Sequence, residues 1–141
     1  MKEHYENVKK FMVAGDQRVR TRVDRTAPKE LRVLGAKLML EEAREACAEL
    51  GVQVDIVIKV VEDIGMVDVG KLAKELADLH VVTTWNQIAY GIPWQTQLQV
   101  DMNNLSKFAP GWSKNEFGKV IPAPGFCKLK ACDLSESLQN E

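Results

Sequence analysis

Five carboxylates fall on or beside the apolar faces of two predicted helices, and this placement limits what the chain can fold into. They are Glu41, Glu42, Glu45, Glu75 and Asp78. Leucines recur around them at steps of three and four, the period of an amphipathic helix that turns one face toward a core. These leucines are Leu31, Leu34 and Leu38 in the first helix, and Leu72, Leu76 and Leu79 in the second. The pattern therefore predicts acids at the edge of a core.

Acids in such a position need a counter-charge. Two like charges about 4 Å apart repel by roughly 4 kcal/mol at an effective dielectric constant of about 20. Divalent cations are the simplest counter-charge, because too few basic residues share the stripe. All-carboxylate sites suit Mg²⁺ or Mn²⁺, hard ions that keep waters and take phosphate oxygens as further ligands. The alternative is a solvated helix face on which Lys37, Arg44 and Lys74 neutralise the acids.

The spacing of the acids fits metal binding. Glu42 and Glu45 are three residues apart, as are Glu75 and Asp78, and residues three apart on a helix project side by side. Two such helices packed antiparallel would bring four oxygen ligands to one place. A di-iron site would instead use Glu-x-x-His on two helices, and neither Glu45 nor Glu75 is followed by that histidine. The spacing therefore disfavours redox iron.

The whole chain reads as an all-α domain with four main helices. Pro28 suits the first turn of a helix, and Gly51 is a usual residue just past a helix end. Residues 52–61 are rich in β-branched side chains and predict a short strand or hairpin arm in preference to continued helix. We expect a four-helix domain over residues 1–126, with this strand or hairpin between its second and third helices, and a tail over 127–141. The predicted helices span residues 4–13, 28–50, 68–90 and 94–108.

Composition narrows the functional class. A chain of 141 residues with 45% hydrophobic side chains is long enough for one domain with its own core. The net charge of −1 gives no overall basic field for nucleic acid or anionic membrane. No run of 18 apolar residues is present, so we expect neither membrane insertion nor export. Three cysteines, an odd number, do not suggest a disulfide framework. A cytoplasmic location is therefore expected.

Three sequence blocks in order resemble a known family. They read Leu38-Met-Leu-Glu-Glu-Ala-Arg-Glu-Ala, then Lys74-Glu-Leu-Ala-Asp-Leu-His-Val-Val, then Asn104-Leu-Ser-Lys107. Together they resemble the all-α nucleoside triphosphate pyrophosphohydrolases, a superfamily that includes MazG, the phosphoribosyl-ATP pyrophosphohydrolases and the dimeric dUTPases. The resemblance covers residues 8–126 and is closest to the short, single-domain MazG-like group of bacteria and phages. Residues 118–126 are similar to the loop after the fourth helix in that group.

The resemblance implies a four-helix MazG-like bundle and a reaction in which water attacks the α-phosphorus of a nucleoside triphosphate. The products would be the monophosphate and pyrophosphate. By resemblance, the Mg²⁺ or Mn²⁺ ligands would be Glu42, Glu45, Glu75 and Asp78. Glu41 would orient or deprotonate the water, although adjacent helical residues point about 100° apart and Glu41 and Glu42 could exchange roles. Phosphate contacts would come from Asn104, Lys107 and Lys119.

The resemblance also implies a homodimer or homotetramer and leaves the substrate open. A purine deoxynucleotide, dGTP first, is preferred because phage-type relatives often act on purine or mixed dNTPs. Phosphoribosyl-ATP or dUTP is the nearest alternative. A non-catalytic helical scaffold that binds metal or nucleotide is a rival from another class. A nucleic-acid-binding module that uses the basic stretch from Arg18 to Arg25 is the third, and a solvated connection is preferred for that stretch.

This chain departs from the family pattern at two places. The stretch between Glu45 and Glu75 is long and rich in valine, where many relatives have a short acidic loop. After Lys119, the family often has a second lysine near Pro122, and it often has an aspartate where this chain has Phe117. Loss of the second lysine would alter affinity or substrate choice.

Overall fold

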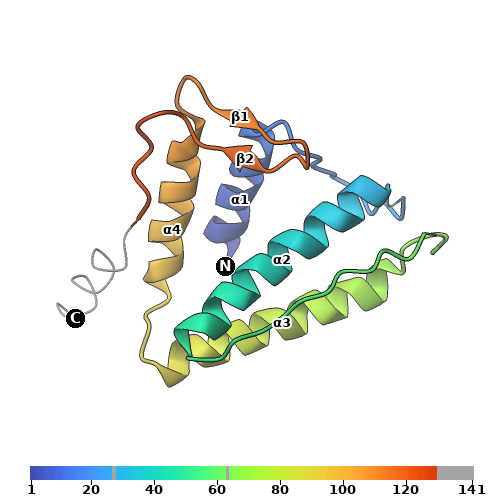
Figure 1. Cartoon of the computed structure of the whole chain (residues 1–141), viewed down its shortest axis with the longest axis horizontal. Coiled ribbons are helices and arrows are strands. Elements are labelled where there is room, and N and C mark those ends of the chain that lie inside the picture. Colours follow the sequence, from blue (N-terminus) through green and yellow to red (C-terminus); the bar gives the residue numbers. More distant parts are fainter. Residues whose placement is uncertain (27, 63, 130–141) are drawn as a thin grey trace. The chain divides into compact units, whose positions relative to one another are not determined.

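A computed structural model describes residues 1–26, 28–62 and 64–129, and these residues are mostly helical (Figure 1). The helices are α1 (Lys2–Ala14), α2 (Lys29–Glu49), α3 (Val69–Ala89) and α4 (Gln95–Leu105), with a short 3₁₀-helix, η1 (Ser106–Phe108), directly after α4. Strands β1 (Ser113–Lys114) and β2 (Val120–Ile121) pair antiparallel. The predicted helical class is confirmed. No helix in the described ranges is both long and apolar enough to cross a membrane.

The helix ends follow local chemistry closely. Pro28 precedes α2 as its N-cap residue instead of standing inside the first turn. At the other end, the N–H of Leu50 donates to carbonyls of the last turn, and Gly51 has a φ of 73°. That left-handed backbone ends the helix and is the reason a glycine suits the position. The fourth helix is predicted to reach residue 108. Its α-helical part ends at Leu105, and the last three residues, Ser106–Phe108, form the tighter 3₁₀-helix η1.

The strand predicted over residues 52–61 is not formed as a paired strand. This stretch is extended, but the described chain pairs strands only between β1 and β2, after the fourth helix. β-branched side chains favour an extended backbone. A sheet also needs a partner strand to receive its hydrogen bonds, and the β-branched pattern carries no information about that partner.

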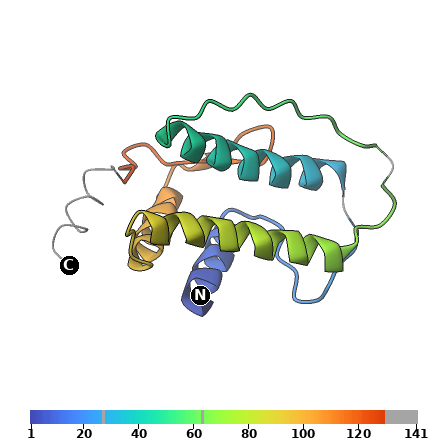
Figure 2. The ribbon, with the colours of Figure 1, turned by 90° about the horizontal axis from the view of Figure 1, so that it is seen from below.

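Two compact units divide the described chain, one formed by residues 23–69 and the other by residues 1–22 together with the chain from Gly70 onward. In the first unit, the chain turns after α2 and runs back along that helix as an extended trace (Figure 2). We call residues 52–62 the extended segment. A 21-residue helix is about 31 Å long, and an extended stretch of ten steps covers about 33 Å. The two lengths match, so the segment can return to the start of α2.

Side chains at the start of α2 fasten the far end of the extended segment. The Arg32 guanidinium donates through Nη1 to the carbonyl oxygen of Val61 at 2.8 Å. The ammonium of Lys29 lies 2.6 Å from Oε1 of Glu62. Both contacts are exposed, so each contributes little stability by itself. Together they fix where the segment ends.

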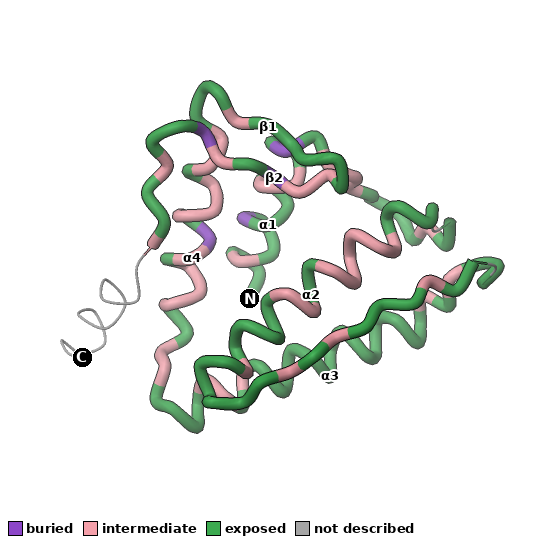
Figure 3. The backbone as a smooth tube through the Cα atoms, viewed as in Figure 1, coloured by how far each residue is buried: buried purple, intermediate pink, exposed green. Residues whose placement is uncertain are grey.

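In the second unit, α1 packs beside α4 (Figure 1). Few of the described residues of this unit are buried, and they lie in α1 and α4, directly after α1, and in or just after β2 (Figure 3). They are Asn7, Gly15, Asp101, Val120 and Ala123. The ring of Phe108 contacts Phe11 and Trp112 edge to face, with centroids 4.9 and 5.1 Å apart, a favourable arrangement for aromatic rings.

Gly15 allows the hairpin to approach the end of α1. A Cβ at this position would lie 3.3 Å from Cγ2 of Val120 and 3.4 Å from the ring of Phe108. Both neighbours belong to the packed part of the unit, so neither can move away freely. A larger residue at Gly15 would therefore push β2 away from α1.

Helices α2 and α3 bury none of their residues within the chain (Figure 3). Leu72 and Leu76 are each 44% exposed, and Leu38 is 37% exposed. Further along α3, Trp85 is 65% exposed and Ile88 is 74% exposed. The apolar faces predicted to line a core thus remain partly open to solvent in the single chain.

Candidate functional site

The acids of α2 lie in its C-terminal half. Glu41 is half-buried, whereas Glu42 and Glu45 are exposed. Glu41 lines an open groove of about 440 Å³ between α2 and the extended segment, and Lys37 and Arg44 line the same groove. The most shielded acid of this helix therefore lies beside the same groove as two cationic side chains.

The acids of α3 converge on one cation. The ammonium of Lys74 lies 3.1 Å from Oε1 of Glu75 and 2.6 Å from Oδ2 of Asp78. All three side chains are exposed. One positive charge therefore reaches both carboxylates at once, as the spacing of three residues predicts.

The two carboxylates raise the pKa of Lys74 above its ordinary value of 10.5, Asp78 contributing more than Glu75. Lys74 is therefore protonated at neutral pH. The stabilising effect of this contact is fully present below the ordinary pKa and is lost only as the pH rises through the raised value. Because the group is fully exposed, solvent screens the contact strongly. Lys74 therefore supplies, on α3, the positive charge that is expected if the acids form a solvent-exposed helix face instead of a metal site.

Removing this ammonium should free the carboxylate pair for a metal ion. We expect Lys74→Met to tighten Mn²⁺ binding roughly fivefold, because the ammonium that occupies the same carboxylate oxygens and repels the ion is removed, although solvent screens that repulsion. Isothermal titration calorimetry with MnCl₂ measures the change. Lys10→Met, on α1, is the control with the same loss of charge. Equal affinities in the two variants would mean that Mn²⁺ does not bind at Glu75 and Asp78.

The five predicted acids are distributed over both units. Glu41, Glu42 and Glu45 belong to residues 23–69, while Glu75 and Asp78 belong to the other unit. Within residues 1–26, 28–62 and 64–129, no group of three or more His, Cys, Asp or Glu residues that could hold a metal ion is found. The donors on each helix are carboxylate oxygens alone, a set that suits Mg²⁺ or Mn²⁺ and not a soft metal.

The predicted phosphate-binding residues lie near the end of α4 and in the hairpin. Asn104 is half-buried in the last turn of α4, and Lys107 is half-buried in η1. Lys119 directly precedes β2 and is half-buried too. Its backbone N–H donates to Oδ1 of Asn115 at 2.9 Å, and this bond shapes the turn of the hairpin. The three residues therefore belong to one unit.

Lys107 has a packing role that its sequence position does not reveal. Its ammonium lies 5.8 Å from the ring centroid of Phe11 and 5.8 Å from that of Phe126. Its carbonyl oxygen accepts a hydrogen bond from the N–H of Ala123 at 3.1 Å. Cation–π contacts of this length are attractive. Lys107 thus joins α1, η1 and the chain after β2.

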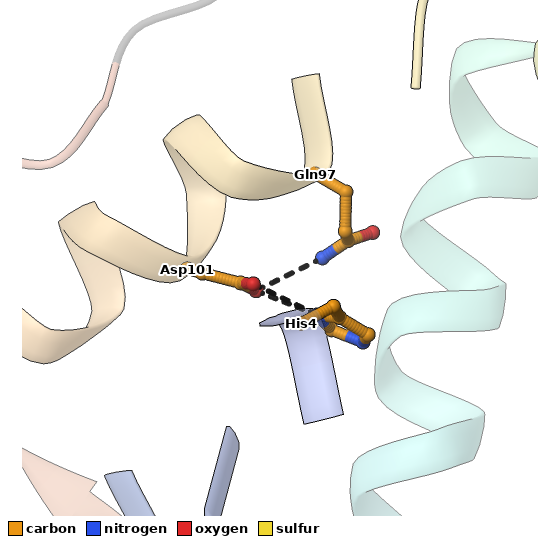
Figure 4. Close-up of polar contacts among 3 residues, drawn as sticks. All are labelled: His4, Gln97 and Asp101. Atoms are coloured by element: carbon orange, nitrogen blue, oxygen red, sulfur yellow. Dashed lines mark hydrogen bonds and ion pairs between the residues drawn. The ribbon is translucent and has the colours of Figure 1, made fainter. Parts of the chain in front are cut away.

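A polar contact between α1 and α4 joins residues that no motif connects (Figure 4). Nδ1 of His4 lies 2.9 Å from both carboxylate oxygens of Asp101. Nε2 of Gln97 donates to Oδ1 of the same carboxylate at 3.2 Å. The Asp101 side chain is only 3% exposed, compared with 35% for His4. The buried carboxylate is therefore satisfied from both helices.

One sequence signal could have identified Asp101. It stands three residues after Leu98 and four before Leu105, so it occupies the apolar stripe of its helix. A lone acid in such a stripe needs a hydrogen-bonding partner when the stripe is buried. The identity of that partner could not be predicted, because His4 is 97 residues away.

Comparison with known proteins identifies no relative. No protein family model, no curated protein and no solved structure matches the chain. The proposal below therefore rests on the residues of this chain and on the three sequence blocks.

Proposed function

We propose that this protein is a metal-dependent nucleotide pyrophosphohydrolase that converts a (deoxy)nucleoside triphosphate and water into the monophosphate and pyrophosphate. The observation that carries the proposal is that the carboxylates of Glu75 and Asp78 lie close together on α3, both within 3.1 Å of one nitrogen atom. Glu42 and Glu45 have the same spacing on α2. The resemblance of the three sequence blocks to the all-α pyrophosphohydrolases supports the same reaction.

The carboxylates would act in two ways. Glu42, Glu45, Glu75 and Asp78 would hold Mg²⁺ or Mn²⁺. The bound ion would supply positive charge against the triphosphate. Glu41 would orient the attacking water and accept its proton, a task for a carboxylate that stays off the metal. Its half-buried position in the groove of α2 suits a group that must be shielded yet reachable.

The phosphate contacts would come from an amide and two ammonium groups. The Asn104 amide can donate to phosphate oxygens, and Lys107 and Lys119 would add positive charge. The Lys107 ammonium lies over two aromatic rings, so substrate binding would have to draw it away from them. We therefore assign the larger share of phosphate binding to Asn104 and Lys119.

We further propose that the helices form a MazG-like four-helix bundle within a homodimer or homotetramer. The exposed apolar side chains of α3 support assembly, since apolar patches of this kind usually mark interaction surfaces. Val81, Trp85 and Ile88 are 64%, 65% and 74% exposed. A second subunit would bury these side chains, which are exposed to solvent in the single chain.

The substrate proposed first is a purine deoxynucleotide such as dGTP, with phosphoribosyl-ATP or dUTP as the alternative of the same chemistry. A non-catalytic helical scaffold is the candidate from another class, and the Lys74 contact favours it because α3 can neutralise its acids without metal. If the protein is such a scaffold, we expect it to bind nucleotide or to gain thermal stability with Mg²⁺ without hydrolysing the nucleotide.

Product analysis tests the proposal. The purified protein is incubated with each of the common NTPs and dNTPs, with Mg²⁺ or Mn²⁺, and the products are separated by anion-exchange chromatography. We expect monophosphate and pyrophosphate, formed fastest from one purine deoxynucleotide. Diphosphate and orthophosphate would contradict attack at the α-phosphorus. No turnover of these substrates, nor of phosphoribosyl-ATP, would favour the scaffold.

A further inference from the structure

The extended segment presents two different faces along α2. Val54, Ile56 and Val60 are half-buried, and every residue from Val54 to Ile58 lines the groove beside α2. The residues between them are more exposed: Val57 is 82% exposed, compared with 41% for Ile58, and Asp55 and Lys59 are exposed too. This alternation has the period of two that defines a β-strand with one covered face. The segment therefore has the geometry of a strand, although it pairs with no other strand in the described part of the chain.

The backbone of this segment is available for pairing. Within the described part of the chain, no backbone hydrogen bond involves residues 53–60. A row of unpaired N–H and C=O groups is the feature that makes an edge strand bind another strand. Folded proteins usually shield such edges with charges or Pro. This stretch contains no proline, and its two charges are of opposite sign.

The apolar residues nearest Val57 are arranged symmetrically on its two sides, and the charged residues are complementary. Ile56 and Ile58 flank it, Asp55 and Lys59 come next with opposite charges, and Val54 and Val60 follow. We propose that this segment pairs antiparallel with the same segment of a second copy, across a two-fold axis at Val57. In this register each Asp55 lies opposite a Lys59, and Val57 lies opposite itself.

Charge complementarity favours the same segment of a second copy as the partner, and it favours the antiparallel direction. Opposite charges on directly facing residues stabilise an antiparallel pair, and like charges destabilise it. A parallel, in-register pairing would place Asp55 against Asp55 and Lys59 against Lys59. The antiparallel register places opposite charges together and pairs Val54 with Val60 and Ile56 with Ile58. It also closes after two copies, as an isologous interface must. The inference does not depend on the proposed enzymatic function, and its tests measure association only.

Disulfide trapping tests the register. In a full-length background with Cys47, Cys127 and Cys132 replaced by serine, Val57→Cys should form a disulfide-linked dimer under mild oxidation. Directly facing residues have Cβ atoms about 4.5–5.5 Å apart, and a small local movement brings them to the roughly 3.5–4.5 Å that a disulfide needs. Val61→Cys is the matched control, because it is also exposed but lies four residues from the axis. Equal cross-linking of the two variants, or none at Val57→Cys, would overturn the proposal.

Charge exchange tests the pairing without oxidation. We expect Asp55→Lys or Lys59→Asp alone to raise the dimer dissociation constant roughly tenfold or more, because each change places like charges opposite each other twice per dimer. The double variant restores both pairs and should return close to the unmodified value. Sedimentation velocity measures association, and circular dichroism verifies the helices. A monomeric unmodified protein, or dimerisation unaffected by the single variants, would refute the interface.

Discussion

Replacing Glu45 with Gln should lower the rate of triphosphate hydrolysis by about a thousandfold, since metal ligation contributes several kcal/mol and each 1.36 kcal/mol is a factor of ten. The variant keeps the shape of the side chain and removes the charge that would hold Mg²⁺ or Mn²⁺. Glu45 is exposed on α2, so its neutralisation should leave the helix intact. Steady-state release of pyrophosphate measures the effect.

Glu49→Gln is the matched control for this prediction. Glu49 is the last residue of α2, is exposed, and lies one turn beyond Glu45. Its neutralisation should leave the rate within about twofold, because it belongs to neither predicted metal pair. Full activity of Glu45→Gln would remove Glu45 from the ligand set. Equal losses in both variants would indicate a general effect of charge on α2.

Replacing His4 with Ala should lower the free energy of unfolding by about 2 kcal/mol, because a buried carboxylate loses a hydrogen-bond donor. Asp101 is only 3% exposed, so water cannot readily replace the imidazole. The Gln97 amide remains in place and limits the loss. Urea unfolding monitored by circular dichroism measures the change. Glu3→Ala, at an exposed neighbouring position, should change stability by less than about 0.5 kcal/mol.

A second variant separates the hydrogen bond from the packing of the histidine ring. In Asp101→Asn the carboxylate charge is absent, so adding His4→Ala should cost less than His4→Ala costs in the unmodified protein. The difference is the coupling between the two residues. Additive effects of the two substitutions would show that the contact does not hold α1 against α4.

Helix positions and the spacing of the acids followed from the sequence because both are local. A helix is set by hydrogen bonds four residues apart, so Pro28, Gly51 and Gly91 mark where helices can begin or end. The pairing of Glu75 with Asp78 on one cation is likewise a consequence of helical spacing. The roles assigned to the acids, and to Asn104, Lys107 and Lys119, stay predictions.

Contacts between distant residues could not be predicted in the same way. Periodicity indicates that a side chain lies on an apolar stripe, but not what covers that stripe. The leucines of α2 and α3 remain partly exposed in the single chain. The β-branched stretch after α2 is extended, and among the described residues no strand pairs with it. The exposure of the leucines and the pairing of the extended stretch both depend on which surfaces pack against each other in the folded protein.

The sequence by itself determined the helices and the three-residue spacing of the acid pairs, and it favoured an extended backbone over residues 52–61, because each depends on neighbours within one or two turns. Only the tertiary structure decided that the Lys107 ammonium lies over Phe11 and Phe126, and that His4 satisfies Asp101. These contacts join residues far apart in the chain. They form only when α1, α4 and the hairpin pack together, and that packing is a sum of many weak contacts that no single motif encodes.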